Sequence, residues 1–284
     1  MNASSNAKII SERLQNAQNK LCRAFEDETK DTFIEDVWSR ENGGGGITRV
    51  IENGSTIDKA GINTSTVFGS IKPNENPAFK HMFTKQNINL DKINDVTFFA
   101  TGISIVIHPK NPFIPTTHAN FRYFELHHPD QTIWWFGGGA DLTPYYLFDE
   151  DATHFHHELK TSCDLVDPTY YPKFKKECDE YFYLPHRNEH RGIGGIFFDY
   201  ENKNWEKDFK FIREVGISFL EISKKIIKRK MKLRYKDKDK DKQLLKRGRY
   251  IEFNLLYDRG TKFGLNSGGN TEAILMSLPP KAKW

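Results

Sequence analysis

The chain has 284 residues, of which 42 are Lys or Arg and 38 are Asp or Glu, so its formal net charge at pH 7 is +4. Hydrophobic residues make up 37%, with 22 Phe, 11 Tyr and 5 Trp, which is enough for a sizeable core and excludes a protein that is disordered throughout. No run of 18 apolar residues occurs, so the sequence predicts no membrane span.

The N-terminal third divides into three predicted parts. Residues 1–30 carry apolar side chains three and four positions apart, which predicts an amphipathic helix. Residues 36–69 contain short β-type runs separated by glycines and by Asn53-Gly54, which predicts hairpins. Residues 74–95 are polar and rich in Pro and Asn, so we expect a surface loop with a short helix.

Residues 101–125 form two predicted strands with a polar face. In the first strand Ser104 and His108 alternate with isoleucines, and in the second His118, Asn120 and Arg122 alternate with aromatic residues. Side chains two residues apart share one face of a strand. If the strands are antiparallel neighbours, all five polar residues lie on one surface, which can hold chemistry while the other face enters the core.

The C-terminal half mixes strands and helices without a regular βαβ order. The run from Ile133 leads into Gly137–Gly139, which we interpret as a strand that ends in a bend. The predicted helices are 150–159, 171–183, 208–230 and 271–278. The predicted strands are 191–199 and 249–257. This order predicts an α+β fold with a mainly antiparallel sheet.

Positive charge is concentrated in residues 223–249. This segment has 14 Lys or Arg and 3 Asp or Glu, a local net charge of +11, so the rest of the chain sums to −7. We predict a basic helix end followed by a solvated loop on a mildly acidic body. The alternative from a binding class is an RNA-binding protein that contacts phosphates through residues 223–249.

Two other patterns allow less specific predictions. The cysteines Cys22, Cys163 and Cys178 are widely spaced and odd in number, so we expect free thiols in a reducing compartment. The N-terminus shows neither a secretory apolar segment nor an Arg- and Ser-rich presequence, so we expect a cytoplasmic protein, or a mitochondrial one if a presequence was removed. Neither glycine run, at 43–46 or at 137–139, matches a nucleotide-binding motif.

Histidines and arginines supply the remaining candidates. All ten histidines lie between residues 81 and 190, and His156, Glu158 and His186 could imitate a two-histidine, one-carboxylate iron site. The alternative from another enzyme class is therefore a non-heme iron oxygenase. Several arginines next to glycines or strand ends could bind carboxylates in a bidentate manner, or could pair with neighbouring acidic residues. They are Arg187, Arg191, Arg247, Arg249 and Arg259.

Five long motifs resemble a known family. They are WSRENGGGGITRV, GISIVIHPKNPFIPTTHANFRYFE, WWFGGGADLTPYY, CDEYFYLPHRNEHRGIGGIFFDY and RGRYIEFNLLYDRGTKFGL. In this order they resemble oxygen-dependent coproporphyrinogen III oxidase, from about residue 36 to the last residue. The resemblance implies one domain over residues 1–284, with a large antiparallel sheet between helices on both faces, and a homodimer. It also implies a reaction of heme biosynthesis, in which O₂ converts two propionates of coproporphyrinogen III into vinyl groups and CO₂ and H₂O₂ are released.

The resemblance also implies roles for individual residues. Asp141 matches an aspartate that accepts pyrrole N–H hydrogen bonds, and His118 matches a proton donor. Arg122 and Arg259 match arginines that hold or neutralise propionates. The other positions that match substrate contacts are Ser104, Asn120, Phe121, Gly268, Gly269 and Asn270.

The cofactor expectations and two departures complete the comparison with the family. No organic cofactor is expected and O₂ is the co-substrate, while a divalent metal at His108, His118, His156 and His186 stays an open possibility. Asn270 stands where many members have arginine. The chain ends at Trp284, where members usually continue.

Overall fold

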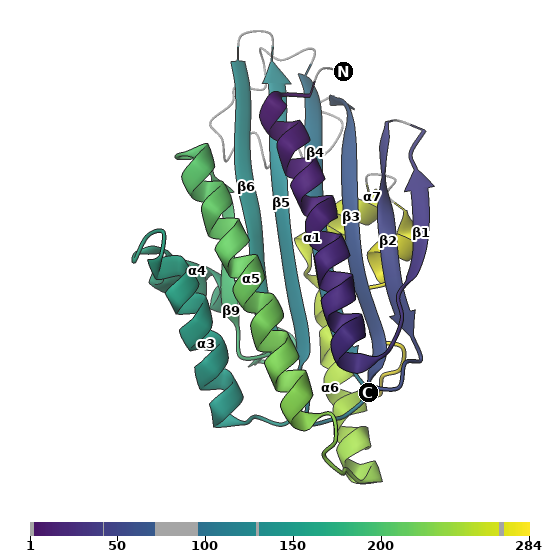
Figure 1. The fold of residues 1–284 in the computed structure, drawn as a ribbon. Helices are drawn as coiled ribbons and strands as arrows, with labels where there is room; N and C mark the ends of the chain where they lie inside the picture. Colours follow the sequence, from purple (N-terminus) through teal and green to yellow (C-terminus); the bar gives the residue numbers. More distant parts are fainter. Residues whose placement is uncertain (1–2, 42, 72–95, 129–130, 267–269) are drawn as a thin grey trace.

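The structure is a computed structural model that describes residues 3–41, 43–71, 96–128, 131–266 and 270–284 (Figure 1). The predicted loop at 74–95 lies entirely in the undescribed segment 72–95, and Gly268 and Gly269 also lie outside the described residues. In the part of the chain that is described, no helix is long and apolar enough to cross a membrane.

One antiparallel sheet of seven strands organises the molecule, in the order β1-β2-β3-β4-β5-β6-β9. Its strands are β1 (Ile34–Ser39), β2 (Gly44–Glu52), β3 (Ile57–Ile71), β4 (Val96–Pro109), β5 (Thr116–His128), β6 (Gln131–Thr143) and β9 (Gly195–Glu201). Neighbouring strands follow each other in sequence except at the last position, where two helices and the separate β7-β8 hairpin lie between β6 and β9 in the chain. The predicted hairpins in 36–69 and the antiparallel pair in 101–125 are confirmed.

The face of the sheet that carries the isoleucines of β4 forms the main core. Helix α1 (Ser5–Thr29) and helix α5 (Trp205–Lys230) cover this face side by side (Figure 1). Both helices start with a side-chain cap, because Ser4 accepts a hydrogen bond from the Ala7 amide and Asn204 accepts one from the Lys207 amide. Their apolar stripes pack against the sheet, which confirms the helices predicted from the three-four spacing.

Helices α3 (Asp149–Asp164) and α4 (Tyr170–Tyr181) lie beside α5 and the edge strand β9. Aromatic rings join them to the core, since Phe174 packs on Phe198 and Phe211. The small hairpin of β7 (Tyr183–Leu184) and β8 (Glu189–His190) follows α4 and leads back to the sheet. The two predicted helices are confirmed, and β9 covers the second half of the strand predicted at 191–199.

The strand predicted at 249–257 is wrong, because residues 249–256 belong to helix α6 (Asp237–Leu256) and Tyr257 caps it. The apolar and β-branched residues suggested a strand, but the buried positions Tyr250, Phe253 and Asn254 follow the spacing of a helix. Tertiary contacts decide the outcome, since Tyr250 packs with Val106 of β4 and Phe253 with Phe182. Helix α6 therefore lies on the face of the sheet opposite α1 and α5.

Two short helices continue from α6 on the same side of the sheet. They are α7 (Arg259–Asn266) and α8 (Thr271–Leu275). Helix α8 begins in the predicted segment 271–278 and ends earlier. Met276, directly after it, joins Val106 and Tyr250 in a small apolar cluster. Helices thus cover both faces, and the large antiparallel sheet between helices that the sequence led us to expect is confirmed.

The prediction for the basic segment 223–249 is only partly correct. Residues 223–230 do form a helix end, but the solvated loop is short, and α6 begins at Asp237 inside the alternating Lys-Asp run. The aspartates favour this start, because acidic side chains stabilise a helix N-terminus. Asp239 accepts a hydrogen bond from the Lys236 amide at 2.8 Å.

The glycines at 137–139 do not end a strand, contrary to our prediction. They lie within β6, which continues to Thr143. The expected close approach of backbone does occur, but to other parts of the protein. A Cβ atom on Gly138 would lie 2.4 Å from the Asn120 carbonyl oxygen. The glycines thus allow the neighbouring strands and side chains to come close.

Candidate functional site

The polar face predicted for the two central strands is confirmed by their register. Ser104 lies directly opposite Asn120, and His118 lies opposite Val106, so the polar side chains of β4 and β5 share one face. Asp141 of β6 pairs with His118 and joins the same face. This is the face that α6 and α8 partly cover, away from α1 and α5.

Asp141 is the centre of the site. It is buried, and each carboxylate oxygen has its own cationic or polar partner. Oδ1 lies 2.6 Å from His118 Nδ1, and Oδ2 accepts a hydrogen bond from Arg191 Nη2 at 2.5 Å. Because a carboxylate oxygen has two lone pairs, both oxygens can still accept a further hydrogen bond from a ligand.

Arg191 holds Asp141 from one side and is itself fixed by aromatic rings. Its guanidinium carbon lies 4.1 Å from the ring centre of Phe182 and 4.4 Å from that of Tyr250. A second hydrogen bond runs from Nη1 to Asn254 Oδ1 at 3.0 Å. The sequence placed Arg191 only in a group of five candidate arginines, and nothing in the sequence pointed to its partner 50 positions earlier.

The surroundings of Asp141 favour its ionised form. Burial alone raises the pKa of a carboxyl group, but the positive charges and hydrogen bonds of Arg191 and His118 outweigh burial and lower the pKa of Asp141 below its usual value. Asp141 is therefore a carboxylate at neutral pH. It acts as a hydrogen-bond acceptor and as a fixed negative charge inside the protein.

His118 connects Asp141 with the open part of the face. An ionised carboxylate can only accept, so Nδ1 of His118 carries the hydrogen in this bond. Its Nε2 has no partner among the described residues, and the side chain is 17% exposed. The carboxylate fixes the orientation of the ring, and Nε2 stays available for proton exchange with a ligand.

Arg122 reaches from β5 across β6 to β9. Its Nη2 lies 2.8 Å from Asp199 Oδ2, and Nη1 donates to Asn120 Oδ1 at 3.2 Å. The side chain passes over Gly137, where a Cβ atom would lie 2.8 Å from Arg122 Nε. The arginine is 37% exposed, so it keeps contact with the open face.

Arg259 differs from the four other arginines in its group. Arg187, Arg191, Arg247 and Arg249 all form ion pairs with acidic residues. Within the described ranges no carboxylate pairs with Arg259, which is exposed at the start of α7. Its guanidinium lies 4.9 Å from the Tyr181 ring centre and 5.2 Å from that of Phe197, which itself stacks on Tyr181. These rings hold a cation whose N–H groups are available to an anion.

The two arginines lie near the same edge strand, β9. Arg122 pairs with Asp199, 2.8 Å away, and Arg259 lies 5.2 Å from the ring centre of Phe197, two residues earlier on that strand. Side chains two residues apart share one face of a strand, so both guanidinium groups lie at the β9 edge of the polar face.

The remaining predicted contact residues have different positions. Ser104 and Asn120 are half-buried on the polar face. Phe121 points to the opposite face and is buried in the main core, so its side chain does not join the site. Asn270 caps α8, because its Oδ1 accepts a hydrogen bond from the Ala273 amide at 3.1 Å.

The four histidines considered as metal ligands do not come together. His108 contacts Thr116 and the Ser277 carbonyl, while His118 contacts Asp141. His156 contacts Tyr171 and the Ile193 carbonyl, and His186 contacts Tyr257 and Glu252. In the described part of the chain, no group of three or more His, Cys, Asp or Glu could hold a metal ion.

The iron-site alternative meets the same difficulty. His156 and His186 have the separate partners just described, and Glu158 pairs instead with His154, 3.7 Å away. These residues therefore do not form the expected triad. The cysteines agree with the prediction of free thiols, since Cys22, Cys163 and Cys178 are all buried and unbonded.

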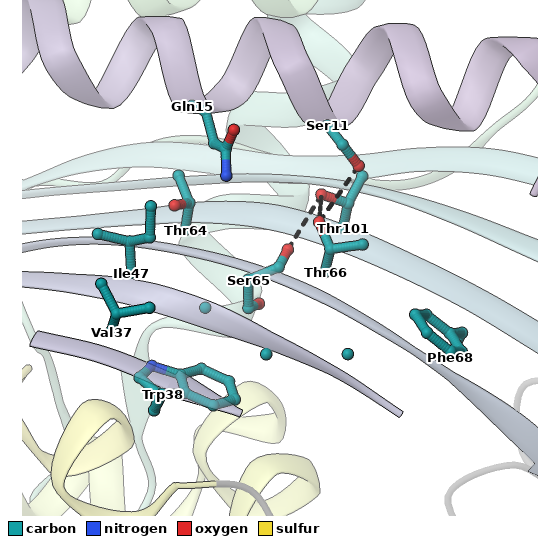
Figure 2. Close-up of a pocket in the computed structure, with 13 residues that line it drawn as sticks. Ser11, Gln15, Val37, Trp38, Ile47, Thr64, Ser65, Thr66, Phe68 and Thr101 are labelled. Atoms are coloured by element: carbon teal, nitrogen blue, oxygen red, sulfur yellow. Dashed lines mark hydrogen bonds between the residues drawn. The ribbon is translucent and has the colours of Figure 1, made fainter. Parts of the chain in front are cut away.

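A surface recess lies on the other face of the sheet. Figure 2 shows it between α1 and strands β1 to β3, with Ser11 of α1 above Thr66 and Thr101. Thr66 is hydrogen-bonded to both, at 3.2 Å from Ser11 and 3.0 Å from Thr101. The recess is lined mainly by hydroxyl groups, glycines and aromatic rings, and it does not include Asp141 or its partners.

The fold and the candidate site are typical of an enzyme, because one face of an antiparallel sheet carries a buried carboxylate beside arginines whose chemistry suits anions. Comparison with known proteins identifies the family. A family profile described as coproporphyrinogen III oxidase matches residues 9–284. The chain belongs to this family.

Three relatives show how close the similarity is. The chain is 50% identical to the oxygen-dependent coproporphyrinogen-III oxidase of Coxiella burnetii over 277 residues, which covers 95% of this chain and 85% of that protein. It is 49% identical to the chloroplastic enzyme of Glycine max, with 95% and 71% covered. It is 48% identical to the enzyme of Drosophila melanogaster, with 94% and 69% covered.

Proposed function

We propose that this chain is an oxygen-dependent coproporphyrinogen III oxidase, an oxidoreductase of heme and porphyrin biosynthesis. It removes CO₂ from two propionate side chains of coproporphyrinogen III and leaves vinyl groups, which gives protoporphyrinogen IX. For each propionate, O₂ takes two electrons and two protons and becomes H₂O₂. The observation that carries the proposal is the buried carboxylate of Asp141 between His118 and Arg191, next to arginines suited to carboxylates.

Recognition of the substrate follows from its charges. Coproporphyrinogen III has four carboxylates around a ring of four pyrrole N–H groups, so its site needs cations at the edge and an acceptor near the centre. Arg122 and Arg259 supply the cations at one edge of the face. On β5, Asn120 lies between Arg122 and His118, and Ser104 lies directly opposite Asn120 on β4, so both can donate or accept further hydrogen bonds.

The chemical step uses Asp141 as an acceptor for pyrrole N–H groups. The reduced pyrrole is electron-rich and is itself the reductant for O₂, so positive charge develops on the ring as electrons leave. The Asp141 carboxylate is ionised in advance and stabilises this charge without reorganisation. His118 exchanges a proton through Nε2 while Asp141 holds its ring in place.

This proposal needs O₂ as co-substrate and no organic cofactor. The histidines at 108, 118, 156 and 186 do not fit a common metal site, so no step is assigned to a metal. Neither of the two alternatives gains support. The iron triad is dispersed, and many cations of segment 223–249 form internal ion pairs with acidic residues.

Assembly, domain organisation and location remain predictions. We propose one oxidase domain over residues 1–284, a homodimer, and a cytoplasmic location. The match of one family profile to residues 9–284 supports the single domain. Two plant relatives are named chloroplastic, so fractionation of the source cells is needed for location. Sedimentation equilibrium of the purified protein tests the dimer.

The test of the proposed function is aerobic incubation of the purified chain with chemically reduced coproporphyrinogen III. We expect CO₂ release and formation of protoporphyrinogen IX, at the same rate with and without a strong chelator. Removal of O₂ should stop the reaction. Absence of CO₂ release from a folded sample in air would contradict the proposed function. Loss of activity with chelator would mean that the reaction requires a metal ion.

A further inference from the structure

His108 is fully buried on the polar face of β4, beneath α6 and α8. Its Nε2 lies 2.9 Å from the Ser277 carbonyl oxygen, and its Nδ1 lies 3.1 Å from Thr116 Oγ1. The ring also packs edge-on against Tyr250, with 5.0 Å between ring centres. Both ring nitrogens are thus engaged with groups of the protein.

The partners of His108 determine which nitrogen carries hydrogen. A carbonyl oxygen can only accept, so Nε2 donates to Ser277. Burial, and then the charge of Arg247, lower the pKa of His108 well below its usual value, so the ring is neutral and Nδ1 accepts from the Thr116 hydroxyl. Neither nitrogen keeps a free lone pair for a metal ion.

The hydrogen bonds that connect Arg247 with His108 all have the same donor-to-acceptor direction. Arg247 Nε donates to the Tyr145 hydroxyl oxygen at 3.3 Å, because an arginine cannot accept. Tyr145 then donates to Thr116 Oγ1 at 2.5 Å, and Thr116 donates to His108. Arg247 itself is buried and paired with Asp58, so this chain of hydrogen bonds starts from a fixed charge.

The hydrogen bonds on the far side of His108 lead to Asp141. Asn254 Nδ2 lies 3.4 Å from Ser277 Oγ, in the residue whose carbonyl His108 binds. Asn254 Oδ1 accepts from Arg191, and Arg191 donates to Asp141. His108 therefore anchors the segment after α8 that supports Asn254, and Asn254 orients the arginine that holds the central carboxylate.

We propose that His108 is a positioning residue of the oxidase reaction, which fixes Asp141 through Ser277, Asn254 and Arg191, and not a ligand of a metal ion. This inference rests on the proposed function. It assigns a task to a residue that touches neither Asp141 nor the open face. Arg122 and Arg259, which we assign to substrate carboxylates, lie outside this hydrogen-bond network.

The network predicts different effects for two substitutions. In His108→Gln the side-chain amide nitrogen replaces the histidine Nε2 and can still donate a hydrogen bond to the Ser277 carbonyl oxygen. In His108→Leu the side chain fills the space but supplies no donor. Misplacing a group at a reacting centre by about 1 Å can cost roughly 100-fold in rate. We expect His108→Leu to lower kcat by about 10- to 100-fold with KM within about threefold of wild type, and His108→Gln to recover much of the kcat.

A matched control separates positioning from loss of stability. Val50 packs against the apolar cluster of Val106, Tyr250 and Met276 that lies next to His108. Val50→Ala loosens this cluster without removing a hydrogen bond, so it should lower Tm and leave kcat close to that of wild type. Thermal unfolding and steady-state CO₂ release on all three variants give the comparison.

The outcomes distinguish this inference from the proposed function. Lack of turnover by folded wild-type protein would contradict the function itself. An active wild type with unchanged kcat in His108→Leu, or an equal loss in the Leu and Gln variants, would overturn the positioning role. So would one bound metal ion per chain in the active wild type, measured by elemental analysis, that disappears in His108→Leu.

Discussion

At the scale of single residues, the site depends on a carboxylate whose charge is maintained by its neighbours. Asp141 has one cationic partner, Arg191, and one histidine partner on separate oxygens. Its folded-state pKa lies below its usual value, so its ionised form adds stability above the unfolded pKa, and this stability is lost as the pH falls through the folded pKa. Activity that needs the carboxylate should therefore persist into mildly acidic solution.

Replacing the cationic partner should shift this pH dependence. In Arg191→Met the positive charge is gone and burial dominates, so the pKa of Asp141 rises. We expect the acidic limb of the kcat/KM profile to move to higher pH than in wild type. Initial rates between pH 5 and pH 9 give the measurement, together with circular dichroism at each pH. An acidic limb at the same pH in both proteins would contradict the role given to Arg191.

Arg259 should contribute to binding more than to chemistry. Its guanidinium is held by Tyr181 and Phe197 and has no carboxylate partner in the described ranges of the chain. A hydrogen bond to a charged group is worth about 1.5–3 kcal/mol, so Arg259→Ala should raise KM roughly 10- to 100-fold. Steady-state kinetics with coproporphyrinogen III measure this change.

A charge-matched control tests whether general positive charge matters. Lys238 lies in the Lys-Asp run at the start of α6, on the basic segment rather than on the polar face. Lys238→Gln removes the same charge as Arg259→Ala and should leave KM unchanged. Equal effects of the two substitutions would mean that the net charge of the protein, and not a placed arginine, attracts the substrate.

At the scale of elements, the alternation of polar and apolar residues predicted the faces of the strands correctly, whereas the strand propensity of single residue types gave a wrong element. The two faces of β4 and β5 followed from the spacing of His118, Asn120 and Arg122, and the register confirmed it. The strand prediction for residues 249–257 was wrong because Tyr, Ile and Phe favour strands, whereas contacts with distant segments decide between strand and helix. The buried positions at 250, 253 and 254 carried the helical signal.

The helical packing of this segment can be tested directly. Phe253 of α6 is fully buried against Phe182 and Tyr181. Phe253→Ala should lower the free energy of unfolding by about 3–5 kcal/mol, because it leaves a cavity in the aromatic cluster. Leu256→Ala on the same helix is the control, since Leu256 is 49% exposed, and should change the free energy by less than about 0.5 kcal/mol. Urea unfolding followed by circular dichroism measures both.

A reversed result would contradict the helix. In a strand at 249–257, residues 253 and 255 would share one face and residue 256 would lie on the other. A small loss for Phe253→Ala together with a large loss for Leu256→Ala would therefore mean that the segment is not packed as α6. The helical arrangement also matters for the site, because Tyr250 and Asn254 reach Arg191 from the same helix face.

At the scale of the whole molecule, the sheet separates the main hydrophobic core from the candidate site. One face packs on α1 and α5 and forms the main core, while the other holds Asp141, His118, Arg122 and the neighbouring Ser104. The sequence could predict which residues share a face, but not which distant residues support them. The pairing of Asp141 with Arg191 depends on how β9 and α6 return to the sheet, which local patterns do not encode.

The positive charge concentrated in residues 223–249 is largely structural. The net charge of +4 comes from a segment with a local charge of +11, and the structure shows many of its cations in ion pairs with Asp58, Asp151, Glu189 and Glu252. This segment therefore connects α5 and α6 to the rest of the fold. We propose that individually placed arginines on the polar face, Arg122 and Arg259, hold the substrate carboxylates.

The central claim is that Asp141 carries the oxidative decarboxylation, and one comparison tests it most directly. CO₂ release from coproporphyrinogen III in air is measured for wild type, for Asp141→Asn and for Asp241→Asn, which makes the same change at an exposed site. Loss of a preorganised electrostatic group costs about 100- to 1,000-fold in kcat. We predict such a loss of kcat in Asp141→Asn with a much smaller change in KM, and no loss in Asp241→Asn. An unchanged kcat in folded Asp141→Asn would contradict the claim.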